Sequence, residues 1–138
     1  MINSIRLGVV FFFIAFFPSL LIVFTQYLIL DLNCDSKVGC TGSFIIMTVA
    51  IAYLSFLSAF AIVISDYIHV YKSGCSLSGM RKIIVLTFGF LLGLSINVVF
   101  YMLDEFTVKT FVLLYFLVPF IFVFLIGFYE KMSHKNTL

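Results

Sequence analysis

Three cysteines and two histidines are the side chains of this chain whose types suit redox, metal or nucleophilic chemistry. Cys34 and Cys40 share a short polar stretch between two long apolar ones, and Gly39 and Gly42 let such a loop close on itself. The charge distribution described below places this loop outside the cytoplasm, where disulfides persist. The sequence therefore predicts a Cys34–Cys40 disulfide, with two free thiols as the alternative. A metal pair is disfavoured because no histidine or further cysteine lies nearby.

The other cysteine and the histidines predict no catalytic site. Cys75 falls on the reducing side and is interpreted as a free thiol. His69 and His134 lie near the ends of apolar stretches, and the chain has no His-Glu-x-x-His metalloprotease motif. No spacing argument supports His69 and Cys75 as a base and a nucleophile. We expect no enzyme activity, no cofactor and no metal.

Small and uncharged polar residues form two stripes at helical spacing. Gly89, Gly93 and Asn97 recur every four residues, which places them on one helix face. Glycines at this spacing let two helix backbones approach closely, and an asparagine can hydrogen-bond across the contact. A comparable stripe in an earlier stretch comprises Thr48, Ala52, Ser55 and Ala59. The stripes predict either packing of the second helix against the third within one subunit, or contact between the subunits of a homo-oligomer.

The elements that carry these residues are four apolar stretches in a chain of 138 residues, 64% hydrophobic and 10% charged. Soluble domains are about 25% charged, so soluble enzymes and disordered proteins are excluded, and a net charge of +2 offers no nucleic-acid footprint. The stretches cover 7–30, 44–64, 83–103 and about 110–129. Such lengths suit helices that cross roughly 30 Å of hydrocarbon. The sequence predicts an all-α polytopic membrane protein, a single domain with four transmembrane helices in a bundle.

The distribution of lysine and arginine predicts that both termini face the cytoplasm. Cytoplasmic loops of membrane proteins carry the excess of basic residues. With both ends inside, six basic residues are cytoplasmic and only Lys37 and Lys109 lie outside. The six are Arg6, Lys72, Arg81, Lys82, Lys131 and Lys135. This predicts an N-in, C-in protein.

The inner loop 65–82 and the tail that begins at Glu130 offer a polar surface on the cytoplasmic side. Residues 65–70 are expected to prolong the second helix, with Asp66 on its wet side, before a turn over 73–79. The candidate surface comprises His69, Lys72, Arg81, Lys82, Lys131 and Lys135. Two interpretations stay open. The surface either binds lipid headgroups or docks a cytosolic protein partner.

No Asp, Glu, Lys, Arg or His falls inside the four spans. Ionisable groups in a membrane usually mark proton relays and substrate sites, so a proton- or ion-coupled transporter is disfavoured. These features favour a non-enzymatic, oligomeric inner-membrane subunit that senses a membrane or external event, anchors a cytosolic partner, or does both.

In size and four-span layout the chain resembles the small inner-membrane proteins of bacterial defence and exclusion systems, such as the membrane component of the Kiwa anti-phage system. The resemblance covers the whole chain as a hydropathy pattern, and no motif carries it. It implies a subunit of the bacterial inner membrane with a role in anti-phage defence.

Two other functions remain as alternatives. Immunity proteins against pore-forming bacteriocins are similarly small and cross the membrane several times, and they would act by helix contacts within the bilayer. A small oligomeric pore is the second alternative, because an uncharged stripe of Ser, Thr and Asn can pass water or ions with little selectivity.

Overall fold

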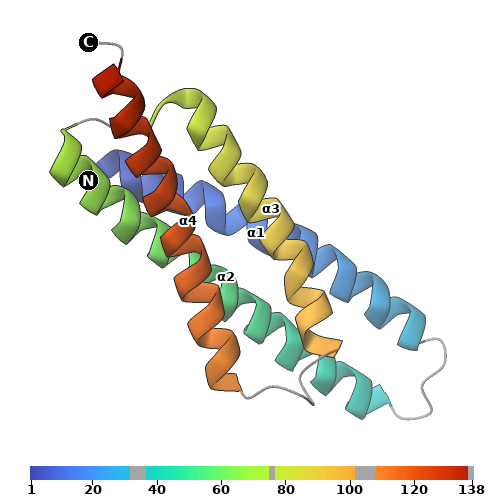
Figure 1. Ribbon diagram of the computed structural model, residues 1–138. Helices are drawn as coiled ribbons and strands as arrows, with labels where there is room; N and C mark the ends of the chain where they lie inside the picture. The colour runs from blue at the N-terminus through green and yellow to red at the C-terminus, as the bar shows by residue number, and fades with distance from the viewer. Residues whose placement is uncertain (32–36, 75–76, 102–107, 137–138) are drawn as a thin grey trace.

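The computed structural model describes residues 1–31, 37–74, 77–101 and 108–136 and is built from four α-helices (Figure 1). They are α1 (Ile2–Asp31), α2 (Lys37–Ser73), α3 (Gly79–Tyr101) and α4 (Val108–Asn136). Each is long and apolar enough to cross a membrane. The predicted all-α fold with four membrane-crossing helices is confirmed.

Two helices run well past the predicted spans at their C-terminal ends. The 37 residues of α2 extend about 55 Å at 1.5 Å per residue, nearly twice the thickness of the hydrocarbon core. Because 65–73 holds neither Gly nor Pro, α2 continues until Gly74, whose φ of 71° ends the helix. The Gly74 N–H donates to Val70 O (2.8 Å), which satisfies a carbonyl of the last turn.

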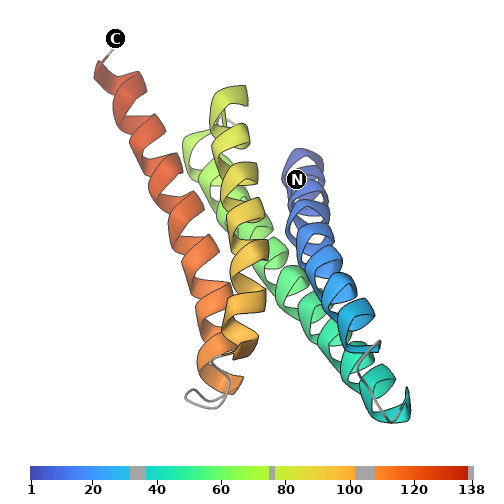
Figure 2. The same ribbon diagram turned by 90° about the vertical axis from the view of Figure 1, so that its right-hand side faces the viewer.

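Three helix pairs make most of the close backbone approaches in the bundle. Helix α2 packs against α1 on one side and α4 on the other, and α3 packs against α1. In the upper part of Figure 2, α1 and α4 lie at opposite flanks of the bundle, with α2 and α3 between them. Both chain termini lie at one end, together with the end of α2 and the start of α3 (Figure 1). We call this the terminal end and the opposite one the distal end.

The small-residue face of α3 packs against α1, so the predicted pairing with α2 is wrong. A Cβ added at Gly89 would lie 2.6 Å from the ring of Phe11, and one at Gly93 would overlap the Ala15 carbonyl. The Ser19 hydroxyl also donates to Gly93 O. The spacing identified the packing face of α3 correctly but carried no information about which helix covers it.

The stripe on α2 is divided between its two neighbours. Ala59 lies against α1, where a Cβ added at Gly8 would be 3.4 Å from its carbonyl oxygen. One residue earlier, the Ser58 hydroxyl donates to Tyr115 O of α4 (2.7 Å). Thr48 donates within its own helix, to Phe44 O (2.8 Å). Ser58 and Ala59 of α2 are thus engaged by α4 and α1, and few residues of α2 approach α3.

Helices α3 and α4 meet through their side chains. The rings of Phe88 and Phe122 stack with centroids 4.1 Å apart, and the Ser95 and Tyr115 hydroxyls lie 2.9 Å apart. Long side chains thus bridge the distance between α3 and α4. Between α1 and α3, by contrast, glycines let the two backbones come into contact. The predicted Cys34–Cys40 disulfide, like Cys75, lies outside the described side chains and stays a prediction.

Candidate functional site

A groove of about 500 Å³ lies between α2 and α4 toward the terminal end. Helix α2 contributes Ile68, His69, Lys72 and Ser73 to its walls. Helix α4 contributes Phe124, Gly127, Phe128, Lys131, Met132 and Lys135. Four of the six residues of the predicted docking or headgroup surface are therefore brought together around one concave surface: His69, Lys72, Lys131 and Lys135. We call it the α2–α4 groove.

The repeat of the α4 sequence places apolar and basic side chains along one face. Phe124, Phe128, Lys131 and Lys135 recur every three or four residues, the spacing of neighbours on a helix surface. The phenylalanines belong to the apolar span and the lysines follow it. One face of α4 therefore changes from aromatic to cationic as the helix leaves the hydrocarbon.

Gly127 lets the imidazole of His69 lie against the backbone of α4. A Cβ added at Gly127 would be 2.5 Å from His69 Nδ1, so no larger residue fits while the ring stays in place. On the other side of the ring, Ser73 Oγ lies 3.4 Å from His69 Nε2, and the same hydroxyl donates to His69 O (2.7 Å). His69 is thus held in the wall between the two helices.

The three lysines of the groove have no counter-charge among the described residues. Lys72, Lys131 and Lys135 are all exposed, and none forms an ion pair within the described part of the chain. An ammonium at the edge of a groove, without a neutralising carboxylate, attracts anions to that surface. The groove therefore has the chemistry of an anion site with an apolar floor.

Arg81 was predicted to share the exposed surface, but the structure engages it within the bundle. Its guanidinium lies 3.6 Å from Glu130 Oε2, donates to Ile126 O (3.3 Å) and stacks 5.3 Å from the ring centre of Tyr129. Glu130 Oε1 accepts the backbone N–H of Ser78 (3.2 Å). These contacts tie the start of α3 to the end of α4. Lys82 follows on α3, outside the groove and half-buried.

Two acidic residues of the terminal end are buried where the sequence suggested water. Asp66 is 3% exposed and Glu130 is 7% exposed. The prediction that Asp66 lies on the wet side of α2 is therefore wrong. Its position is set by packing between helices, which local periodicity does not reveal. The apolar lining of the groove, in contrast, was detectable from the spacing of Phe124 and Phe128 before Lys131.

The mid-span polar residues form no comparable site. Asn97 was expected to hydrogen-bond across a helix contact, yet its Nδ2 has no partner among the described residues. The buried Ser55 Oγ is likewise without a partner there. Within the described residues, no three side chains of His, Cys, Asp or Glu are grouped to hold a metal.

Comparison of the chain with family models, with curated proteins and with solved structures found no match. Its class therefore rests on its own helices. The length and hydropathy of the four helices make the chain a multi-pass, all-α membrane protein.

Proposed function

We propose that this protein is a non-enzymatic subunit of the bacterial inner membrane that anchors a soluble protein at its terminal end. The observation that carries the proposal is where its most exposed large apolar side chains lie. Tyr71, Ile2, Met80 and Met1 are 82%, 81%, 78% and 75% exposed, the highest values among the described residues of this kind. All four belong to the terminal end, on three different helices or beside them.

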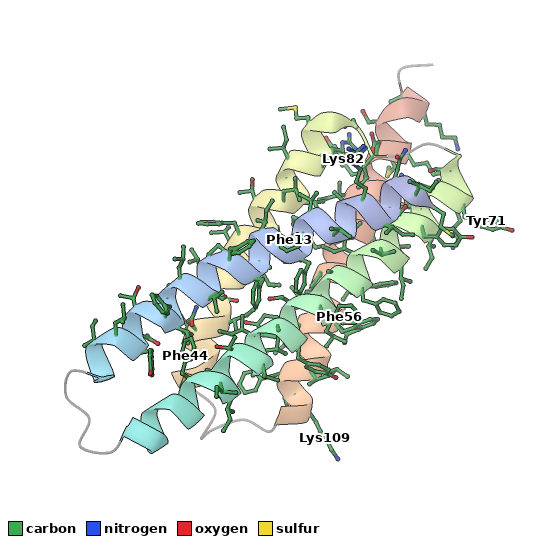
Figure 3. All side chains as sticks on the ribbon, turned by 180° about the vertical axis from the view of Figure 1, so that it is seen from behind. Phe13, Phe44, Phe56, Tyr71, Lys82 and Lys109 are labelled. Atoms are coloured by element: carbon green, nitrogen blue, oxygen red, sulfur yellow. The ribbon has the colours of Figure 1, made fainter. Side chains whose placement is uncertain are left out.

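Ile2, Tyr71 and Met80 lie in the outermost turns of the candidate spans, at one end of the bundle. Basic residues accompany them along the chain: Arg6 near the N-terminus, Lys72 beside Tyr71, and Lys82 shortly after Met80. Figure 3 shows Tyr71 and Lys82 at one end of the bundle and Lys109 at the other. Apolar groups rimmed by charge at a water-exposed end are typical of a protein-binding surface.

The side of the membrane follows from the same charges. Because basic loops stay in the cytoplasm, the terminal end faces inward, N-in and C-in. A partner bound there is cytosolic. The small size and four-span layout support placing this anchor among the membrane components of bacterial anti-phage defence, and this role is part of the proposal.

Self-association of the subunit remains a prediction with less support than the sequence suggested. The glycine face of α3, which favoured a subunit contact, is covered by Phe11 and Ala15 of α1. A homo-oligomer would therefore need another surface.

Photo-crosslinking at two tyrosines of α2 tests the anchor. Tyr71 and Tyr53 are both exposed, but Tyr53 lies near the middle of α2 and Tyr71 lies in its last turn. With benzoylphenylalanine at each position in turn, we expect Tyr71→benzoylphenylalanine to capture a soluble protein and the Tyr53 variant to capture none. Deleting the chain should then release the captured protein from the membrane fraction. A captured protein that stays on the membrane without the chain, or equal capture at both positions, would contradict the proposal.

A further inference from the structure

We propose that the α2–α4 groove binds an anionic phospholipid. The phosphate of the headgroup would lie among Lys72, Lys131 and Lys135, and one acyl chain would lie along the aromatic side of the groove. This site shares Lys72 with the rim of the surface proposed for the soluble partner and otherwise uses different residues.

The order of residues along the groove matches the order of parts in a phospholipid. Phe124 and Phe128 lie inside the membrane-crossing part of α4. Lys131 lies at the end of this part, and Lys135 lies one turn beyond it. An acyl chain needs the apolar part and a phosphate needs the basic part. Basic pockets between transmembrane helices on the cytoplasmic side are suited to anionic headgroups.

The acidic side chains described near this surface are buried inside the bundle and do not face the groove. Glu130 precedes Lys131 in the chain, yet its carboxylate is buried against Arg81 of α3. Asp66, six residues before Lys72, is buried as well. Both acids described at the terminal end are thus inside the bundle while the lysines of the groove are outside. The positive charge of the groove is left for an external anion.

Depth distinguishes a lipid from the other anions that the lysines could attract. Free phosphate would use the basic rim and leave Phe124 and Phe128 uncovered. An acidic peptide from the cytosol would have to enter the hydrocarbon to reach those rings. The groove volume of about 500 Å³ falls in the range of small-ligand sites, roughly 300–1,000 Å³, and suits a headgroup with the first part of one chain.

Fluorescence quenching reports on this lipid directly, because the chain has no tryptophan. The reporter is Phe128→Trp in the groove, and the matched control is Phe13→Trp on α1. Phe128 is 56% exposed and Phe13 is 46% exposed, and Figure 3 shows Phe13 midway along α1. Each protein is reconstituted in phosphatidylcholine vesicles that contain brominated phosphatidylglycerol or, in equal amount, brominated phosphatidylcholine. Circular dichroism checks that each variant is folded.

We expect brominated phosphatidylglycerol to quench Phe128→Trp more strongly than brominated phosphatidylcholine, and the two lipids to quench Phe13→Trp equally. Adding Lys131→Gln to the reporter should lower the preference for phosphatidylglycerol about fivefold, the effect of one basic residue near a membrane surface. Adding Lys109→Gln, on the same helix at the distal end, should leave it unchanged.

Three outcomes would overturn the lipid site. Equal quenching of Phe128→Trp by the two lipids would show that the groove does not select the anionic headgroup. Equal preference at Phe13 and Phe128 would show only a general attraction of the protein for anionic lipid. Loss of the preference on adding inorganic phosphate or a soluble polyglutamate peptide, at constant ionic strength, would assign the lysines to a free anion or to an acidic protein segment.

Discussion

Glycine has opposite consequences at two helix contacts of this protein. At Gly93 the missing side chain brings α3 onto the backbone of α1 at Ala15, and the contact is closed. At Gly127 the missing side chain admits the ring of His69, and the surface beside it stays open as the α2–α4 groove. A small residue therefore locates an approach between helices, but the neighbour that fills the space decides whether the contact is structural or available to a ligand.

The two regions also differ in how their polar groups are satisfied. In the α1–α3 contact the Ser19 hydroxyl donates to Gly93 O, so the protein supplies its own partner. In the α2–α4 groove three lysines lack a counter-charge from the described chain. Ser19 therefore has its hydrogen-bond partner within the bundle, whereas the lysines that we assign to ligand binding have no charged partner in the described chain.

The largest expected effect comes from closing off the approach at Gly93. Gly93→Ala places a methyl group onto the Ala15 backbone, which cannot move aside as a side chain can. Overpacking of this kind costs about 1–3 kcal/mol, and we expect the upper end of that range. The matched control is Gly79→Ala, where an added Cβ meets nothing within 4 Å. Thermal unfolding in mild detergent is followed by circular dichroism. The midpoint temperature should be lower than that of the unmodified protein for Gly93→Ala and unchanged for Gly79→Ala. Equal midpoints would show that α1 and α3 are not in backbone contact.

Gly127→Ala should destabilise the protein less, by about 1 kcal/mol, because the group it meets is the movable ring of His69. The test is a double-mutant cycle with His69→Ala. The ring and the added methyl compete for one space, so the double variant should be more stable than the sum of the two single changes predicts. Additive effects would place His69 away from the wall of the groove.

Ser19→Ala removes one hydrogen bond across the closed contact and should cost about 0.6 kcal/mol, the mean for such bonds in membrane proteins. Thr87→Val serves as the control, because the Thr87 hydroxyl bonds only to Ile83 O of its own helix in the described structure (2.9 Å). Denaturant unfolding in detergent should separate the two variants. If Thr87→Val loses as much stability as Ser19→Ala, the hydrogen bond between Ser19 and Gly93 adds no more stability than a bond within one helix.

Asn97→Leu should change the free energy of unfolding least, and the question is whether this change is a loss or a gain. Asn97 is 7% exposed, and its Nδ2 has no hydrogen-bond partner among the described residues. Replacing a buried amide whose NH2 group lacks a partner with an apolar group of similar size is close to neutral or stabilising. The same unfolding measurement should therefore show no loss. A clear loss of stability would show that Asn97 does form the stabilising hydrogen bond to another helix that its spacing suggested.

The sequence was sufficient for the fold class and the number of helices, because bilayer thickness and backbone hydrogen bonding leave few solutions for long apolar stretches. It was insufficient for helix partners. The four-residue spacing of Gly89 and Gly93 describes one helix only, and α1 covers it where α2 was expected. The Arg81–Glu130 pair joins residues far apart in the chain, so its burial was not readable from local pattern.

The α2–α4 groove could be predicted in part, unlike the fold class, which was fully predictable, and the helix partners, which were not. The change from Phe128 to Lys131 on one face of α4 is visible in the sequence, as are His69 and Lys72 on α2. What local pattern does not reveal is that these faces meet, because that depends on α2 continuing to Ser73 and on Gly127 admitting an imidazole.

Labelling at the two ends of α4 shows whether the terminal end, with the α2–α4 groove, faces the cytoplasm as we propose. Lys109 and Lys131 are both exposed and lie at opposite ends of this helix. Each is changed to cysteine in a chain whose native Cys34, Cys40 and Cys75 are serine, and intact spheroplasts are treated with a membrane-impermeant maleimide. We predict that Lys109→Cys is labelled at once and Lys131→Cys only after permeabilisation. Labelling of Lys131→Cys in intact spheroplasts, with Lys109→Cys protected, would contradict the account.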